Sequence, residues 1–446
     1  MSRSTTATSA AKLPAIPAQP AKPAQKNSLR HLKASDARGF ALLATQATRG
    51  VTGISESVHQ AVWQTLGAPG KKADGQVGEV PGNKTSGITG LVYQCIRGAT
   101  NLVERGLDAT LARLQPLFEA VDHGHSESTE RAAVLSALNG VLGDHLAASC
   151  NPLATPMSLR HQGQVLDLSA LPANFQASGK VLLAIHGLCM NDLQWNAANH
   201  SATGDPQPVN HIETIAQNLG YIAIYLRYNS GLHTSQNGHE LARQLAQLTQ
   251  AWPVPIEELS VVVHSMGGLV IRSAAYSATQ SGLAWPGLLK KIVFLGTPHH
   301  GAPLERAGNW VDVILGSTPY SRPFAKLGQL RSAGITDLRY GHVLDADWQG
   351  HDRFRKKPDS RTPLPLPEGI ACFTVAATLA ARRGTLADRL VGDGLVPLHS
   401  ALGQHDKPEH RLAFGKASQF IAYGTNHLQL LSSPQVTQKI AAWLGA

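Results

Sequence analysis

The sequence predicts an α/β protein built on a mostly parallel central sheet with helices on both faces. After Pro156, short apolar runs that suit strands alternate with segments of helical spacing such as 240–250. This alternation favours parallel strands joined by crossover helices. With 446 residues, 43% of them hydrophobic, the chain can bury a large core. The expected strands are residues 157–161, 181–185, 222–225, 259–263, 292–295, 372–376 and 420–423.

The chain before this α/β region has a different composition. Residues 1–36 are rich in Ala, Pro, Ser, Thr and Lys, which predicts a disordered tail. Residues 37–150 are expected to form a helical extension, because apolar residues follow helical spacing at 88–114 and 130–146. These helices either pack on the main domain, residues 151–446, or present a surface to a membrane, a lipid granule or a partner.

Charge and cysteine content exclude several classes of function. The net charge of +9 favours anionic surfaces, but the chain has no nucleic-acid-binding motif, so no nucleic-acid partner is expected. The densest basic cluster, 353–357, is interpreted as a solvated loop or a contact with an anionic surface. The four cysteines lack metal-ligand spacing. No apolar run suits a transmembrane span or a secretory signal, so we expect a cytoplasmic protein, with peripheral contact to a lipid surface left open.

The stretch Val263-His264-Ser265-Met266-Gly267-Gly268 directs an apolar strand into a serine and two glycines. A buried strand that ends in a glycine turn would explain it. The alternative is a nucleophilic serine on a sharp turn between a strand and a helix, where small residues keep the two elements from colliding.

Three other stretches carry polar groups near the ends of expected strands. His186-Gly187-Leu188 follows the strand at 181–185, Gly392-Asp393-Gly394 follows the strand at 372–376, and Asn426-His427-Leu428 follows the strand at 420–423. In an open parallel sheet, ligand-binding and catalytic residues lie at the carboxyl ends of the strands.

In this order, the four stretches resemble the α/β-hydrolase superfamily, and within it the lipases, over roughly residues 157–446. The resemblance implies that Ser265 is the nucleophile, Asp393 the triad acid and His427 the general base. It also implies that the backbone N–H groups of Leu188 and Met266 form an oxyanion hole. The chain departs from the usual G-x-S-x-G pattern, because Val263 occupies the position of the first glycine.

Alternatives remain open for two triad members. Asp388 is the other candidate acid, and three histidines precede the last strand as other candidate bases. Those histidines are His399, His405 and His410.

About seventy residues separate Pro298 from Gly369, too many for a structureless loop in a compact domain. We interpret residues 301–369 as a helical cap over the strand ends, or as ordinary packing of helices. Beside it, His299 and His300 are interpreted as structural or pocket-lining residues. Some bacterial lipases bind calcium through an Asp two residues after the catalytic histidine. This chain has Gln429 there, so neither a metal nor another cofactor is expected.

The predicted function is a serine carboxylic-ester hydrolase, similar to lipases and esterases, that acts on a hydrophobic acyl ester or lipid. An acyltransferase, a thioesterase or a lipid amidase would use the same triad. A third interpretation is a non-catalytic scaffold that binds a partner through its N-terminal helices. The sequence assigns no oligomeric state.

Overall fold

The computed structural model describes residues 35–36, 38–40, 42–43, 129–171, 175–198, 208–302, 331–355, 358–381 and 392–446. Its centre is an eight-stranded sheet made of β1 (Ser158–His161), β2 (Gln164–Val165), β3 (Lys180–Ile185), β6 (Ile222–Arg227), β7 (Glu258–His264), β8 (Leu289–Leu295), β9 (Ala371–Thr378) and β10 (Gln419–Tyr423).

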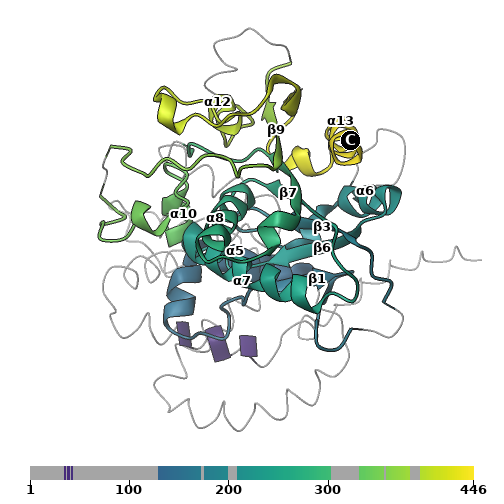
Figure 1. Ribbon diagram of the computed structural model, residues 1–446. Helices are drawn as coiled ribbons and strands as arrows, with labels where there is room; N and C mark the ends of the chain where they lie inside the picture. The colour runs from purple at the N-terminus through teal and green to yellow at the C-terminus, as the bar shows by residue number, and fades with distance from the viewer. Residues whose placement is uncertain are drawn as a thin grey trace, which may run out of the picture.

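The strands lie in the order β10-β9-β8-β7-β3-β6-β1-β2 (Figure 1). From β10 to β6 all neighbours are parallel, whereas β1 is antiparallel to both β6 and β2. All seven predicted strands are therefore confirmed, and the predicted fold class with them. The mostly parallel part brings the carboxyl ends of β3, β6, β7, β8, β9 and β10 to one edge of the sheet.

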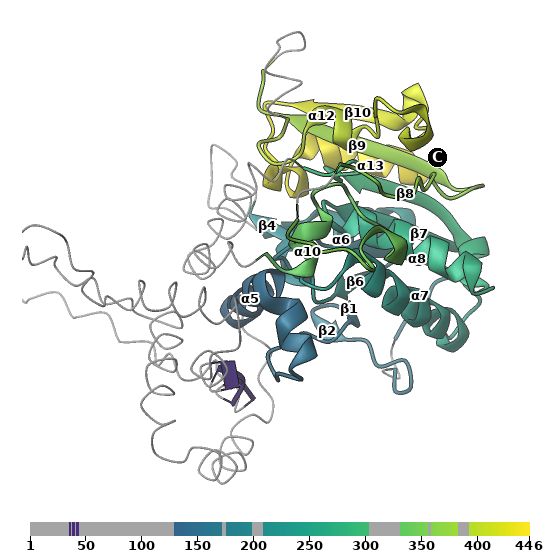
Figure 2. The same ribbon diagram turned by 90° about the vertical axis from the view of Figure 1, so that its left-hand side faces the viewer.

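Four long helices cover the two faces of the sheet: α6 (His211–Leu219), α7 (Thr234–Ala251), α8 (Gly267–Gln280) and α13 (Pro434–Gly445). In β3, Val181, Leu183 and Ile185 belong to the apolar cluster under α7 and α8. Leu182 and Ala184 belong to the cluster under α6 and α13. Because successive strand residues point to opposite faces, a continuous apolar run serves a sheet that is buried on both sides. Figures 1 and 2 show the two helical layers on either side of the strands.

Two further helices, α5 (Thr129–Ala148) and α10 (Ala333–Asp337), pack near the carboxyl ends of the strands (Figure 2). A Cβ at Gly140 of α5 would lie 2.1 Å from Sγ of Cys189, in the loop after β3. A Cβ at Gly143 would lie 1.8 Å from Oδ1 of Asn229, after β6. The helix predicted at 130–146 is thus confirmed, and it packs on the main domain. The pattern at 88–114 lies outside the described residues, as does nearly all of the predicted tail.

The short elements were not predicted, because two to four residues show no periodicity. Apart from β2, they are β4 (Asn196–Ala198), β5 (Pro208–Asn210), α12 (Leu398–Ala401) and the 3-10 helices η2 (Asp192–Trp195), η3 (Trp285–Leu288), η6 (Asp345–Asp347), η7 (Pro408–His410), η8 (Lys416–Ser418) and η9 (Leu428–Leu431). In the described part of the chain, no helix combines the length and apolarity that a membrane span requires.

Candidate active site

Ser265 and Met266 form the two-residue turn between β7, which ends at His264, and α8, which begins at Gly267. The φ of Ser265 is +55°, a left-handed backbone conformation that costs a non-glycine residue about 1–3 kcal/mol. The backbone N–H of Ser265 donates to the carbonyl of Leu295 at the end of β8, at 2.8 Å. This strained turn directs the serine side chain out of the sheet at the carboxyl ends of the strands.

The two glycines after the serine are required by close packing. A Cβ at Gly267 would lie 2.7 Å from the carbonyl oxygen of His186, and one at Gly268 would lie 2.2 Å from Oγ1 of Thr297. Val263 is different, because its side chain is fully buried in the apolar cluster under α7 and α8. The turn therefore forms without the first glycine of the G-x-S-x-G pattern.

Asp393 and His427 form a buried pair after β9 and β10. Nδ1 of His427 lies 2.6 Å from Oδ2 of Asp393, and the backbone N–H of His427 donates to the Asp393 carbonyl at 3.1 Å. The other carboxylate oxygen of Asp393 accepts the N–H groups of Leu395 and Val396, at 3.0 and 2.7 Å. The carboxylate is thus held by three groups, and the backbone bond is a fourth contact between the two segments, which together fix the plane of the imidazole.

The structure brings His427, not another histidine, to Asp393. His405 instead lies 3.8 Å from Asp359, and its ring centroid is 4.9 Å from that of His410. Within the described residues His399 forms no hydrogen bond or ion pair with Asp393, and Asp388 lies outside those residues.

Ser265 lies close to this pair. Its backbone N–H donates to the carbonyl of Leu295, the last residue of β8. A Cβ on the following residue, Gly296, would lie 3.1 Å from both Cε1 and Nδ1 of His427. The side chains of Ser265, Asp393 and His427 belong to residues no more than 2% exposed. Oγ of Ser265 has no hydrogen-bond partner among the described residues. A buried hydroxyl without a partner, beside an oriented imidazole, is suited to proton transfer.

The loop after β3 reaches the serine from the other side. A Cβ at Gly187 would lie 2.9 Å from Cβ of Ser265, so only glycine allows this approach. The N–H groups of Leu188 and Met266 donate to no acceptor within the ranges that the structure describes. Leu188 and Met266 therefore flank the serine with two amide donors still available to a developing oxyanion.

A buried ion-pair network, which the sequence analysis missed, fixes this loop. Asp192, the first residue of η2, lies 3.0 Å from Nε of Arg160 on β1 and also pairs with Nε of Arg227 on β6. Nearby, the N–H of Cys189 donates to Oγ of Ser230 at 3.0 Å. The loop is thereby tied to β1 and β6, which pair with each other in the sheet.

His264 is a second residue that the sequence analysis missed. Its Nε2 lies 3.1 Å from the carbonyl oxygen of His427, and the two ring centroids are 4.6 Å apart. Because a carbonyl only accepts, Nε2 of His264 carries the proton. Burial, reinforced by the neighbouring His427, holds the pKa of His264 well below its usual value, so the ring is neutral at pH 7. His264 thus secures the backbone of His427 from the side opposite Asp393.

If this site hydrolyses esters, as we propose, His264→Phe is expected to lower kcat by about 3- to 10-fold with little change in KM, because one hydrogen bond contributes about 0.5–1.5 kcal/mol net. His264→Gln keeps a side-chain N–H and should recover part of the loss. Steady-state kinetics on both variants tests this. Wild-type kcat in both would show that His264 does not position His427.

Apolar side chains surround the amide donors. Leu188 and Met266 belong to one cluster with residues of α5, of the segment around α10 and of the loop after Asp393. The described part of the predicted cap therefore packs directly on the turn that carries Ser265. Residues 303–330 of the cap lie outside the described residues. The cluster members from these three segments include Val141, Leu142, Ile335, Leu338, Leu395 and Val396.

His299 and His300 are packed beside a buried arginine. The carbonyl of His299 accepts Nη1 of Arg361 at 2.9 Å, and Nδ1 of His300 lies 2.8 Å from its Nη2. Burial lowers the pKa of His300 to about 3, and that of His299 lies well below its usual value for the same reason. Among the described residues, neither ring forms a hydrogen bond with Ser265, Asp393 or His427, which agrees with a structural interpretation.

The thiol of Cys189, in the loop after β3, is buried. Burial raises the pKa of the Cys189 thiol, which opposes formation of the thiolate. Within the described ranges, no group of three or more His, Cys, Asp or Glu side chains is placed to hold a metal ion.

Comparisons with known proteins give distant likenesses. A family model described as a domain of unknown function, DUF7379, matches residues 154–337. A search of curated proteins finds no match. The chain is similar to the solved Bacillus licheniformis lipase BlEst2 in mature form (18% identity, TM-score 0.37, 62% of this chain and 96% of that chain). It is also similar to an esterase from Pyrobaculum calidifontis (12%, 0.36, 76% and 98%) and to Aspergillus fumigatus lipase B (10%, 0.35, 89% and 83%).

Because these likenesses are distant, the fold is assigned from the sheet topology and the backbone of this structure. The sheet is mostly parallel and covered on both faces, with a serine on a strained turn between a strand and a helix. The acid and the histidine follow two later strands, in the order serine, aspartate, histidine. This arrangement is that of the α/β-hydrolase fold.

Proposed function

We propose that the protein is a serine hydrolase that cleaves carboxylic esters with a hydrophobic acyl group. The observation that carries the proposal is the convergence of the strained Ser265 with the buried His427–Asp393 pair at one edge of the sheet. The apolar cluster that includes Leu188 and Met266 suits an apolar acyl chain better than a charged substrate group.

In the proposed reaction, Oγ of Ser265 attacks the ester carbonyl carbon while Nε2 of His427 takes the hydroxyl proton. The carbonyl π electrons move to oxygen, and the resulting oxyanion accepts hydrogen bonds from the N–H groups of Leu188 and Met266. The tetrahedral intermediate then collapses, the C–O bond to the alcohol breaks, and His427 returns its proton to the leaving oxygen. This leaves an acyl group on Ser265.

In the second half, His427 removes a proton from water, and the hydroxide attacks the acyl carbon. Collapse releases the carboxylic acid and returns the proton to Ser265. Asp393 keeps the proton of the imidazole on Nδ1, so that Nε2 faces the serine, and it stabilises the imidazolium formed in each half. An alcohol in place of water would give acyl transfer at the same site.

The test is hydrolysis of p-nitrophenyl esters from acetate to palmitate. We expect the rate to rise with chain length in the wild type and to fall by at least about 10³-fold in Ser265→Ala. Ser281→Ala, at the opposite end of α8, is the matched control and should retain wild-type rates. Wild-type rates in Ser265→Ala would refute the proposal. A product ester formed when an alcohol is added would assign acyl transfer instead.

A further inference from the structure

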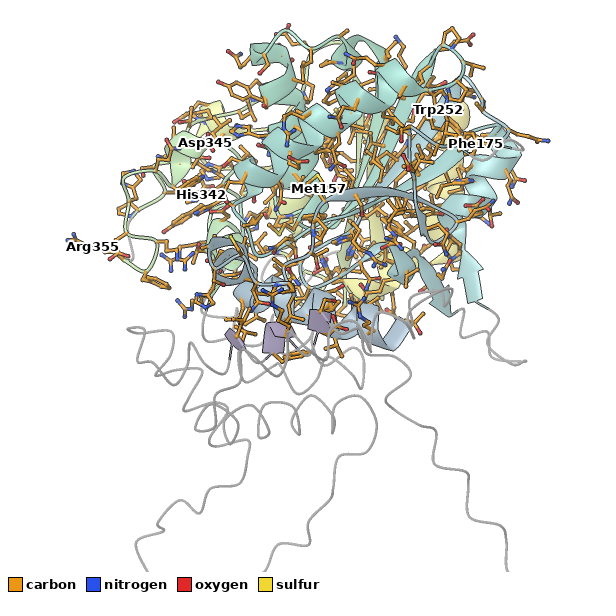
Figure 3. All side chains as sticks on the ribbon, turned by 90° about the horizontal axis from the view of Figure 1, so that it is seen from below. Met157, Phe175, Trp252, His342, Asp345 and Arg355 are labelled. Atoms are coloured by element: carbon orange, nitrogen blue, oxygen red, sulfur yellow. The ribbon has the colours of Figure 1, made fainter. Side chains whose placement is uncertain are left out.

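A basic loop with an exposed aromatic residue projects from the segment after α10. The side chain of Phe354 is 54% exposed, and the guanidinium of Arg353 lies 4.9 Å from its ring centroid. Arg355, which follows, is exposed, and Figure 3 shows it at the outer edge of the molecule, beyond His342 and Asp345. The sequence continues with two lysines, so this is the densest basic cluster in the chain.

Behind the loop lies a pocket whose lining includes Arg339, Tyr340, Trp348, Arg353 and Arg355. Arg353 pairs with Asp144 of α5. Among the described residues, no carboxylate forms an ion pair with Arg339 or Arg355, although Nη1 of Arg339 lies 3.3 Å from the Arg355 carbonyl. Two guanidinium groups of the lining therefore keep their charge available to an external anion.

The carboxylates of the same lining are engaged by the protein itself. Asp337 accepts the backbone N–H of Thr234 at 2.8 Å and lies 2.9 Å from Nδ1 of His233. Although burial alone would raise it, hydrogen bonds from His233 and His342 hold the pKa of Asp337 below its usual value. Asp352 accepts the N–H of Phe354 at 2.9 Å.

Asp347, the third carboxylate of the lining, accepts three backbone N–H groups, those of Val343, Leu344 and Thr362, at 2.9–3.0 Å. These hydrogen bonds leave the carboxylates charged, so the three aspartates of the lining offset its three arginines. What the pocket offers a phosphate is the pair of guanidinium groups, those of Arg339 and Arg355, that form no ion pair with a carboxylate of the described residues.

The loop and pocket lie on the active-site side of the sheet. A Cβ at Gly334, in α10, would lie 2.0 Å from the carbonyl oxygen of Ser230 and 3.1 Å from Cε of Met266. The pocket begins at Thr336, in the same short helix. The pocket therefore shares the short helix α10 with a residue that packs against Met266, next to Ser265.

We propose that Phe354 and the arginine pocket dock the protein on an anionic lipid bilayer. The phenyl ring enters the headgroup region, and Arg339 and Arg355 bind headgroup phosphates, while the negative surface potential attracts the whole basic cluster. Docking does not depend on catalysis, so it and the proposed ester hydrolysis can fail separately.

The experiment is co-sedimentation of the full chain with vesicles of phosphatidylcholine alone or with about 30% phosphatidylglycerol, at low and high salt. We expect binding to the anionic vesicles, weakened by salt, and little binding to the neutral ones. Arg355→Glu should lower the partition coefficient by at least about fivefold, and Phe354→Ser by about tenfold.

Two matched controls change the same chemistry elsewhere. Val165→Ser removes an exposed apolar side chain on β2, and Lys290→Glu reverses an exposed charge on β8; both should bind as the wild type does. Equal binding to neutral and anionic vesicles, or loop variants that bind as well as the controls, would overturn the proposal. Binding of inorganic phosphate that Arg339→Glu abolishes, without vesicle binding, would assign the pocket to a free anion instead. Circular dichroism of each variant establishes that it is folded.

Discussion

Replacing Asp393 with asparagine is expected to lower kcat for ester hydrolysis by about 10⁴-fold, because the asparagine amide stabilises the wrong imidazole tautomer. In the native protein, Oδ2 lies 2.6 Å from Nδ1 of His427, while Oδ1 accepts the N–H groups of Leu395 and Val396. Those two N–H groups require an acceptor. The asparagine oxygen will therefore occupy the Oδ1 position, and its NH₂ group will face His427. That NH₂ group forces the imidazole proton onto Nε2, and a protonated Nε2 cannot accept the proton of Ser265.

The measurement is kcat for a medium-chain ester together with thermal unfolding. Because asparagine has the shape of aspartate, the unfolding temperature should change little. Asp406→Asn, an exposed change in the loop between Asp393 and His427, is the control and should leave kcat unchanged. A kcat within tenfold of wild type in Asp393→Asn, with folding intact, would mean that Asp393 does not orient the base.

Replacing Asp192 with alanine is expected to lower the free energy of unfolding by about 3–5 kcal/mol. Its side chain is about 2% exposed, and it pairs with Arg160 and Arg227, whose side chains are 8% and 10% exposed. Removal of the carboxylate leaves two buried guanidinium charges without this counterion. The loss of the pair therefore costs more than the pair itself contributes to stability.

Urea unfolding measures this loss, and Glu240→Ala is the matched control. Glu240 pairs with Arg243 on the exposed face of α7, so its removal should cost less than about 1 kcal/mol. Asp192→Ala should also lower kcat in protein that remains folded, since the loop that carries Leu188 loses its anchor. A change below about 1 kcal/mol in Asp192→Ala would show that the network does not hold this loop.

Local patterns predicted the parts of the fold that local physics determines. The run of Leu259, Val261, Val262 and Val263 predicts a strand buried on both faces, and β7 follows it. The glycines after Ser265 indicate a tight turn, which the contacts of Gly267 with the strand end at His186 explain. The resemblance to lipases implies that Asp393 pairs with His427, and the structure has Oδ2 of Asp393 2.6 Å from Nδ1 of His427.

The parts that the sequence did not reveal depend on contacts between distant residues. Nothing around Asp192 indicates that it pairs with two arginines on different strands. Likewise, the bond from His264 to the His427 carbonyl spans 163 positions of the chain. The apolar face of α5 was visible as a helical pattern, but its partner, the loop at Cys189, was not, because periodicity shows that a face is buried and not what covers it.

Covalent trapping with a fluorophosphonate identifies the nucleophile, which we propose to be Ser265. The protein would be incubated with the reagent, and the adduct located by intact-mass and peptide mass spectrometry. We expect one adduct per chain, on Ser265, absent in Ser265→Ala and formed much more slowly in His427→Ala. Failure of the folded wild-type protein to react, or an adduct on any other residue, would contradict this proposal.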